Sequence, residues 1–422
     1  MDTIAAIATG SGAAGVGVIR ISGPRAIEIA EACTGGPLDR TVRLRRVRDL
    51  AGEAIDEVLA FAMRAPHSFT GEDVAELQGH GGAANLARLL AAVVERGARP
   101  AEPGEFSRRA FEHGKLDLIR AESLLEVIHA GSERAWRLAQ ANLSGRLGAE
   151  IEAIEARALK ILAEIEGTID FPDADLDARS AAWVASELAW LHDACAALAG
   201  GFRHGRAVVD GISVALVGEV NAGKSSLLNA LVGTERAIVD ATPGTTRDYL
   251  EVRDVWDGIA VTLIDTAGTR ETTDAVEQRG IALGAARVAA ADVVVVLNGD
   301  VGRYGERGVA VRSKADLGGQ GAGIATSVIT GEGLEALKRA VLATAGVADR
   351  EGNEQAFVTT SRQQALAAIA RDAFAAAQRV TRGPELVALE IQQATTALAQ
   401  LRGVEVGDRV LDELFARFCI GK

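Results

Sequence analysis

The sequence is short of lysine, cysteine and aromatic residues, and these shortages narrow the class of protein. Only 6 of its 45 Lys and Arg residues are lysine, and aromatic residues make up 4% of the chain. The three cysteines, Cys33, Cys195 and Cys419, are far apart and form no CxxC pair, which favours a reducing compartment over a disulfide framework. The most apolar run, residues 281–297, contains two charges and is too short to span a bilayer easily. Because no basic segment leads into an apolar run at the N-terminus, we expect a cytoplasmic protein with no membrane association.

The chain also lacks an excess of positive charge. It carries 45 Lys and Arg against 58 Asp and Glu, a net charge of −13, which excludes a general nucleic-acid binder and leaves RNA contact to a local patch. One candidate patch consists of Arg43, Arg45, Arg46 and Arg48. With 48% hydrophobic residues the chain is too apolar for disorder, and at roughly 100–200 residues per domain its length predicts two to four domains.

The pattern of apolar residues divides the chain into three kinds of segment. Residues 1–118 read as mixed α/β, with strands expected at 4–8, 16–21, 58–63 and 74–77 and helices at 24–32 and 83–95. Residues 119–207 and 347–422 show helical spacing and are expected to pack as one bundle. Between them, residues 208–346 alternate strands with helical runs, which predicts an inserted, doubly wound α/β domain. Its buried parallel strands are expected at 212–217, 259–264, 293–297 and 324–328.

Residues 218–225, GEVNAGKS, fit the phosphate-binding pattern GxxxxGK[ST] between an expected strand and an expected helix. Glycines let the backbone N–H groups turn toward phosphate oxygens. Lys224 would reach the β- and γ-phosphates, and the Ser225 hydroxyl would ligate Mg²⁺. The alternative is a Gly-rich turn with a solvent-facing lysine.

Three further elements favour a nucleotide site over that alternative. Asp265, at the end of an expected strand, can hold Mg²⁺ through water, and Gly268 can offer an N–H to a γ-phosphate. Residues 243–248, PGTTRD, form a turn-rich loop whose threonine hydroxyls would complete the Mg²⁺ shell only beside a γ-phosphate, as a switch. After a later strand, Asp316 could accept hydrogen bonds from guanine N1 and N2 while Lys314 covers the base.

These residues resemble a GTPase G domain, and more closely the bacterial tRNA-modifying GTPase family called MnmE or TrmE. Residues 15–23, 68–82, 103–118 and the terminal FCIGK at 418–422 look like signatures of that family and extend the resemblance over the whole chain. The fold it implies is multidomain α/β: an N-terminal α+β domain like those that bind tetrahydrofolate (1–118), a helical bundle from two separated segments, and an inserted P-loop G domain. The activity it implies is GTP hydrolysis.

The resemblance also implies site residues. It implies that a K⁺ ion is bound by Asn221, Asp240, Thr242 and Thr245. It also implies that Mg²⁺ is held by Ser225 and Thr246. Glu277 matches the catalytic residue that orients the attacking water, although from the residues alone it is a solvated charge on a helix. The residues implied to bind GTP are Asn221, Ala222, Gly223, Lys224, Ser225, Ser226, Asp240, Thr245, Thr246, Asp265, Thr266, Ala267, Gly268, Ser313, Lys314, Asp316, Ser327 and Val328.

The base-reading motif departs from the family pattern. Ser313 stands where an Asn usually ties the base-binding loop to the P-loop, so we expect guanine selection through Asp316 with weaker nucleotide affinity. Ser327-Val328 replaces the usual Ser-Ala, where the contact is a backbone N–H to guanine O6. The stretch from residue 265 to 313 is short, which indicates that a helix or loop after residue 297 is missing.

The N-terminal segment offers a second site. Arg20 and Glu76 share strand faces with apolar residues, and from the residues alone they read as a structural ion pair. By resemblance Arg20, Glu76, Lys115 and Lys422 bind a 5-formyl- or 5,10-methylene-tetrahydrofolate. A terminal lysine at that site requires the C-terminal helix to dock near the N-terminal domain. Cys419 is expected to have a positional role rather than a nucleophilic one.

The function implied is modification of tRNA wobble uridine at C5, with the folate supplying carbon and GTP hydrolysis driving conformational change. The partners implied are a second copy of the chain, an FAD flavoprotein of the MnmG or GidA type in a heterotetramer or larger complex, and tRNA. Two alternatives remain open: a ribosome-assembly or regulatory GTPase without modification chemistry, and a scaffold that binds nucleotide without turnover.

Overall fold

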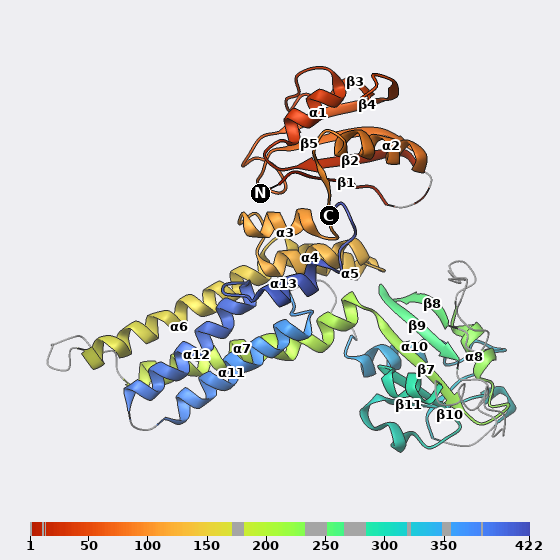
Figure 1. The fold of residues 1–422 in the computed structure, drawn as a ribbon. Coiled ribbons are helices and arrows are strands. Elements are labelled where there is room, and N and C mark those ends of the chain that lie inside the picture. The colour runs from red at the N-terminus through yellow and green to blue at the C-terminus, as the bar shows by residue number, and fades with distance from the viewer. Residues whose placement is uncertain are drawn as a thin grey trace. The chain divides into compact units, whose positions relative to one another are not determined.

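The computed structural model describes residues 2–10, 12, 14–170, 181–232, 251–265, 284–318, 322–347, 356–380 and 383–422. The chain divides into two compact units (Figure 1). The N-terminal unit consists of residues 1–125 and 402–422, and the central unit of residues 126–401. The last residues of the chain therefore belong with the first. Among the described residues, no helix is both long enough and apolar enough to cross a membrane.

The N-terminal unit is built on a six-stranded sheet with the order β3-β4-β5-β2-β1-β6. Its pairs are antiparallel except β1 with β6. The strands are β1 (Ile4–Ile7), β2 (Ala14–Ser22), β3 (Arg43–Arg48), β4 (Ala54–Met63), β5 (Val74–Gly81) and β6 (Arg99–Pro100). Helices α1 (Ala26–Thr34) and α2 (Ala83–Val94) pack on one face and bury a core with the strands. The four expected strands and both expected helices are confirmed, whereas β3 and the two-residue β6 were not expected.

Three more helices lie at the end of this unit: α3 (Glu105–Glu112), α4 (Leu118–His129) and α13 (Asp408–Phe415). Arg108 of α3 forms an ion pair with Asp412 of α13 at 2.6 Å. Beyond α13, Ile420 forms an antiparallel bridge with Pro103. These contacts dock the C-terminal segment on the N-terminal unit.

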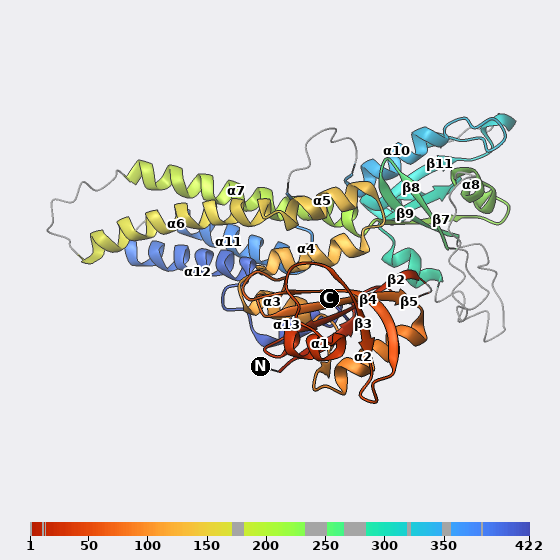
Figure 2. The same cartoon turned by 90° about the horizontal axis from the view of Figure 1, so that it is seen from above.

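Long helices make up one part of the central unit: α5 (Glu133–Leu143), α6 (Arg146–Asp170), α7 (Ala181–Val209), α11 (Ser361–Arg379) and α12 (Pro384–Arg402). Helices α7 and α11 pack along each other, and α6, α7, α11 and α12 lie side by side in Figure 2. Phe374 of α11 and Leu191 of α7 are fully buried. Helices from the two distant segments thus pack together, but the bundle is smaller than expected: residues 119–125 and 402–422 belong to the N-terminal unit, where the C-terminal segment bonds to residues of the first strands.

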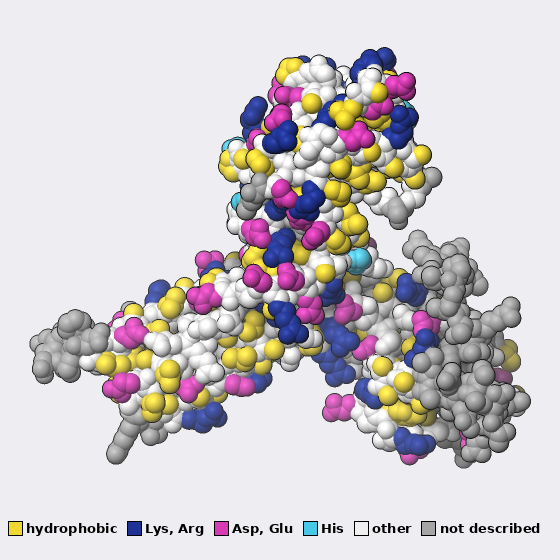
Figure 3. Space-filling view, in the orientation of Figure 1, with side chains coloured by type: hydrophobic (Ala, Val, Ile, Leu, Met, Phe, Trp, Pro, Cys, Tyr) yellow, Lys and Arg dark blue, Asp and Glu magenta, His cyan; other side chains and the backbone are white. Residues whose placement is uncertain are grey.

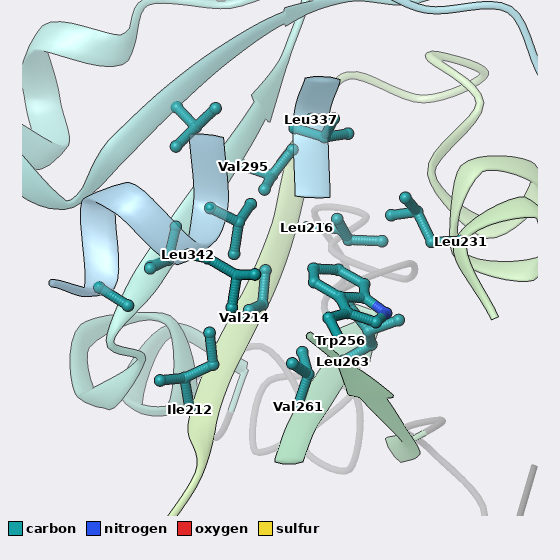
Figure 4. Close-up of a cluster of buried hydrophobic side chains, with 14 of the residues drawn as sticks. Ile212, Val214, Leu216, Leu231, Trp256, Val261, Leu263, Val295, Leu337 and Leu342 are labelled. Atoms are coloured by element: carbon teal, nitrogen blue, oxygen red, sulfur yellow. The ribbon is translucent and has the colours of Figure 1, made fainter. Parts of the chain in front are cut away.

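The other part of the central unit is a six-stranded sheet with the order β12-β11-β10-β7-β9-β8. The strands are β7 (Ile212–Gly218), β8 (Glu251–Trp256), β9 (Ile259–Asp265), β10 (Val293–Leu297), β11 (Gly308–Arg312) and β12 (Ile324–Ala325), all parallel to their neighbours except β8. Helix α8 (Lys224–Leu231) follows β7, and α10 (Leu334–Ala345) follows β12. Figure 4 shows Val214, Leu216 and Val295 of the strands near Leu337 and Leu342 of α10. The expected strand at 324–328 ends at Ala325, and β8 and β11 were not expected.

The connection from β10 to β11 is unusually short. Parallel strands generally need a crossover of a dozen or more residues, most often an α-helix. Here Leu297 and Gly308 are joined by a short turn and the 3₁₀ segment η1 (Val301–Arg307), which is kinked at Gly305. The Asp300 carboxylate caps its first turn by accepting from Gly302 N at 2.9 Å. We expected a helix or loop to be missing after residue 297, and this 3₁₀ segment stands in its place.

Candidate functional site

The phosphate-binding pattern lies in the loop between β7 and α8. Gly223, the N-cap of α8, has a φ of 93°, and Asn221 has a φ of 64°. The loop therefore has the left-handed backbone from which successive N–H groups can form an anion-binding concavity. Lys224 Nζ donates to Gly218 O at 2.8 Å and to Glu219 O at 2.9 Å. The lysine thus lies over the loop that it follows, where a phosphate can replace the two carbonyls.

A hydroxyl and a carboxylate meet beside this loop. Ser225, in the first turn of α8, donates from Oγ to Asp265 Oδ2 at 2.7 Å. Asp265 ends β9, the neighbour of β7, and is buried. Hard oxygen ligands of this kind suit Mg²⁺, which keeps several waters and needs few protein ligands. The pair predicted from the sequence to hold the metal is therefore adjacent in space.

The base-reading segment follows β11 and contacts the P-loop directly. Ser313 Oγ donates to Ala222 O at 2.7 Å, and Lys314 Nζ donates to Asn221 O at 3.0 Å. The serine therefore keeps a bond to the P-loop in spite of its shorter side chain. Asp316, in the 3₁₀ turn η2 (Ala315–Leu317), is exposed, as a group that must meet a base requires.

One residue of this region was missed by the sequence reasoning. Asn298, directly after β10, donates from Nδ2 to Ser313 Oγ at 2.7 Å and accepts from Ser313 N at Oδ1 at 3.0 Å. Its φ of 53° is left-handed. The only sequence signal was the Asn-Gly dipeptide after a buried strand, which is typical of a left-handed turn and says nothing about the partner.

The second base-contacting segment, Ser327-Val328, follows β12. Ser327 N donates to Glu332 O at 3.0 Å, and Ser327 Oγ accepts from the N–H groups of Ile329 and Thr330 at 3.3 Å each. The serine thus organises its own turn. Val328 is 42% exposed.

The N-terminal unit contains the predicted Arg20–Glu76 pair. Arg20 NH2 lies 2.9 Å from Glu76 Oε1, and both side chains are largely buried. The second carboxylate oxygen, Oε2, accepts from Gln78 Nε2 at 3.2 Å. Arg20 NH1 also donates to Gly421 O at 3.4 Å, which brings the C-terminal segment to this pair.

The comparisons with known proteins agree over the whole length. Residues 3–115 match the family model described as GTP-binding protein TrmE N-terminus, and residues 118–419 match the MnmE helical domain. A tRNA modification GTPase MnmE of Symbiobacterium thermophilum is 40% identical, with 100% of this chain and 99% of the relative covered. The chain belongs to the MnmE family. The enzyme class predicted from the sequence, a GTP hydrolase, agrees with that membership.

Other MnmE relatives are equally complete. Those of a Synechococcus species and of Akkermansia muciniphila are 42% and 37% identical over 100% of this chain and 98% and 99% of their own. Among solved structures, the G domain of the T. maritima FeoB iron transporter matches 32% of this chain and 98% of its own at 28% identity, with a TM-score of 0.26. So low a score adds nothing to the fold argument.

Several residues assigned by resemblance to the MnmE family lie outside the described residues. They are Asp240, Thr242, Thr245, Thr246, Thr266, Ala267, Gly268 and Glu277. The K⁺ shell apart from Asn221, the switch threonine and the catalytic glutamate therefore stay predictions. Ser226 lies in the first turn of α8, next to Ser225.

The other residues assigned to the MnmE folate site do not all meet one another. Lys115 Nζ donates to Pro66 O at 3.0 Å, and Lys422 N donates to Cys419 O at 3.3 Å. In the part of the unit that the structure describes, neither lysine side chain forms a hydrogen bond or an ion pair with Arg20 or Glu76. Only the backbone of Gly421 reaches the ion pair.

Two of the four arginines of the candidate basic patch of this MnmE member are paired with carboxylates. Arg43 pairs with Asp39 at 3.0 Å, Arg46 pairs with Glu57 at 2.8 Å, and Arg48 donates to Gly52 O. On the face in view, Figure 3 shows basic and acidic side chains interspersed over the N-terminal unit. The four arginines are therefore a weaker phosphate-binding surface than the sequence alone indicated.

Proposed function

We propose that this chain hydrolyses GTP as the switching step of wobble-uridine modification in tRNA. The observation that carries the proposal is the Ser225–Asp265 hydrogen bond beside the Lys224 loop, with the base-reading segment bonded to the same loop. These contacts put the phosphate, metal and base elements of a guanine-nucleotide site at one edge of one sheet. MnmE membership supports the tRNA role.

The residues have distinct tasks in this proposal. Lys224 exchanges its two carbonyl partners for β- and γ-phosphate oxygens. Ser225 and Asp265 would hold Mg²⁺, Ser225 by its hydroxyl and Asp265 through water, and the metal would supply neutralisation of phosphate charge. Asp316 accepts from guanine N1 and N2. Because Ser327 N is committed to Glu332 O, the N–H offered to guanine O6 is that of Val328.

Steady-state GTP turnover of the full chain tests the nucleotide site. We expect Ser225→Ala to lower kcat about 100-fold or more, because a metal-binding group that acts on transition-state charge is lost. Asn229→Ala, an exposed change on the same helix α8, is the matched control and should leave turnover within about twofold. Full activity in Ser225→Ala would contradict the metal assignment.

We further propose that a K⁺ ion beside the phosphates, held partly by Asn221, replaces the charge that an arginine finger supplies elsewhere, and that Glu277 orients the attacking water. The left-handed Asn221 supports the first part, because its side chain sits in the turn of the phosphate loop. Turnover in K⁺ should exceed turnover in Na⁺, and Asn221→Ala should abolish the difference. Equal rates in both salts, or full activity in Glu277→Ala, would remove the corresponding assignment.

A folate site around Arg20 and Glu76 is the second part of the proposal. Arg20 donates to a carboxylate oxygen and lies within 5.8 Å and 5.9 Å of the ring centroids of Phe69 and Phe106. A pterin pairing with Glu76 must displace Gln78 from Oε2. Calorimetry with 5-formyl-tetrahydrofolate tests this: Glu76→Gln should weaken binding at least about tenfold, since the charged acceptor is lost. Binding unaffected by that change would leave the pair purely structural.

The open face of the N-terminal sheet supports a homodimer. Helices α1 and α2 cover the face that carries Val58 and Leu77. On the opposite face, Leu44 lies across from Leu59, and both are exposed, at 63% and 45%. An apolar pair left in water on the edge strand β3 and its neighbour β4 suits a second copy of the same surface. Light scattering should give a dimer for the full chain and a monomer for Leu44→Glu; a monomeric parent chain would contradict the proposal.

The tRNA role and the FAD flavoprotein partner of the MnmG type rest on family membership and on the net charge of −13, which leaves most RNA contact to a partner. Mass analysis of wobble uridines in cells without this chain is the direct test. Unchanged uridines together with intact GTP turnover would favour a regulatory GTPase instead.

A further inference from the structure

The described part of the chain contains five non-glycine residues with positive φ, and three of them gather at the nucleotide site: Asn221, Asn298 and Lys314. Such backbone is unfavourable for most L-residues and concentrates where function requires a particular aim. Asn221 and Lys314 are in the loops that contact ligand in the proposed function. Asn298 lies outside those loops. Its left-handed backbone is explained by the contacts that its side chain makes.

Both functional atoms of the Asn298 amide are used on one residue. Nδ2 donates to Ser313 Oγ at 2.7 Å, and Oδ1 accepts from Ser313 N at 3.0 Å. Asn298 is itself fixed, because its backbone N–H donates to Val311 O at 2.9 Å, one strand away. The amide therefore holds Ser313 from a rigid position at the end of β10.

This arrangement fixes where the Ser313 proton points. A serine hydroxyl has one donor and two acceptor positions. Because Asn298 Nδ2 donates into the oxygen, the hydroxyl proton is available for Ala222 O, which accepts it at 2.7 Å. The result is a directed chain from Asn298 through Ser313 to the P-loop, and successive bonds of this kind strengthen one another.

We propose that Asn298 is a positioning residue for guanine nucleotide: it supplies, from a different strand, the amide that the Ser313 position lacks, and thereby joins the base-reading loop to the phosphate loop. The inference rests on the proposed function. The sequence led us to expect a base-reading loop that is held weakly. Asn298 and Ser313 together hold it instead, and we call this pair the clamp. Asn298 touches no phosphate or base, so its loss should weaken binding and leave the chemical step unchanged.

Titration of the full chain with fluorescent GDP, together with steady-state GTP kinetics, tests the clamp. Asn298→Asp is the sharpest variant. Its shape is retained and Ser313 N keeps an acceptor, but a carboxylate cannot donate, so the serine hydroxyl turns toward it and releases Ala222 O. We expect about a tenfold rise in Kd for GDP and in KM for GTP, with kcat within about twofold.

A double-mutant cycle and a control separate positioning from general damage. Because Asn298 acts only through Ser313, Asn298→Asp in a Ser313→Ala background should cost no more than Ser313→Ala alone. Asp300→Ala, which removes the cap of η1 in the same turn, should lower the thermal midpoint without raising Kd. Additive losses in the cycle, or a Kd for Asp300→Ala that rises as much as that for Asn298→Asp, would overturn the inference.

The two proposals can fail separately. If the parent chain binds and hydrolyses GTP while Asn298→Asp binds GDP as tightly as the parent, the clamp is wrong and the proposed function stands. If the parent chain binds no guanine nucleotide at all, both are overturned.

Discussion

Replacing Gly421 with alanine should release the C-terminal segment from the N-terminal unit. Gly421 has a φ of 93°, and a Cβ there would lie 2.4 Å from Ile7 O and 2.8 Å from Ala8 Cα. These backbone atoms at the end of β1 are held by pairing with β2 and cannot move away easily. Alanine therefore meets both a left-handed φ, which costs about 1–2 kcal/mol, and a collision. The segment gives way because it is the end of the chain.

What the segment loses on release sets the size of the effect. Phe418 is 3% exposed, and burying a phenylalanine contributes about 1.5–3 kcal/mol. The hydrogen bond from Arg20 to Gly421 O adds about 0.5–1.5 kcal/mol. These two contributions add to about 2–4.5 kcal/mol, and we expect the strain and the collision together to outweigh them. The docked fraction should fall from nearly complete to a minority.

Hydrogen–deuterium exchange of the C-terminal peptide measures this. Exchange in the Gly421→Ala chain should be at least about 30-fold faster than in the parent, since 1.4 kcal/mol is a factor of ten. Gly52→Ala is the matched control: its φ of 87° imposes the same strain, but nothing lies within 4 Å of the new Cβ. Gly52→Ala should leave exchange at the C-terminus unchanged. If Gly421→Ala also leaves it unchanged, the close approach to Ile7 is not what holds the segment.

Two further predictions follow from the titratable groups. A thiol reagent should label exposed Cys419 quickly and buried Cys33 and Cys195 only on unfolding, because burial raises the pKa of both thiols, to about 12 for Cys195; rapid modification of all three would contradict this. A hydrogen bond from Arg99 lowers the pKa of Asp2 from 3.8 to about 2, so its stabilisation is present above pH ~4 and is lost as the pH falls toward 2. Since Asp2 is 54% exposed, the amount is under about 1 kcal/mol. The urea midpoint of Asp2→Asn should fall less on acidification than that of the parent, and parallel falls would refute the assignment.

The sequence predicted best where the signal is local. The P-loop is a contiguous motif, and β7, β9 and β10 are apolar runs buried from both sides, so neither needs knowledge of a distant partner. The left-handed Gly223 follows from the same pattern. The Ser225–Asp265 bond joins residues 40 positions apart and depends on the pairing of β7 with β9.

Edge strands were harder to predict. Strand β3, Arg43–Arg48, buries only Val47, and the edge strand β8 buries only Val252 and Trp256. Charged residues at the edge of a sheet oppose association with other strands, so such strands look like loops in the sequence. The arginines of β3 were accordingly interpreted as an RNA patch, whereas two of them pair with carboxylates.

Asn298 could not be predicted because its role depends on a contact. It lies 15 residues from Ser313, and the two come together only because β10 and β11 are neighbours joined by a 3₁₀ helix. In the sequence, Ser313 appears only as the loss of the amide side chain that is usual at that position. In the structure, Asn298 supplies that amide from the end of β10.

The docked C-terminal segment also links folding to synthesis. The bond from Arg20 to Gly421 joins residues 401 positions apart. At about 5–20 residues per second, a ribosome needs some 20–80 s to pass from one to the other. Throughout that interval the nascent N-terminal unit lacks the bridge between Pro103 and Ile420. The C-terminal segment can dock on the N-terminal unit only after translation has passed Gly421.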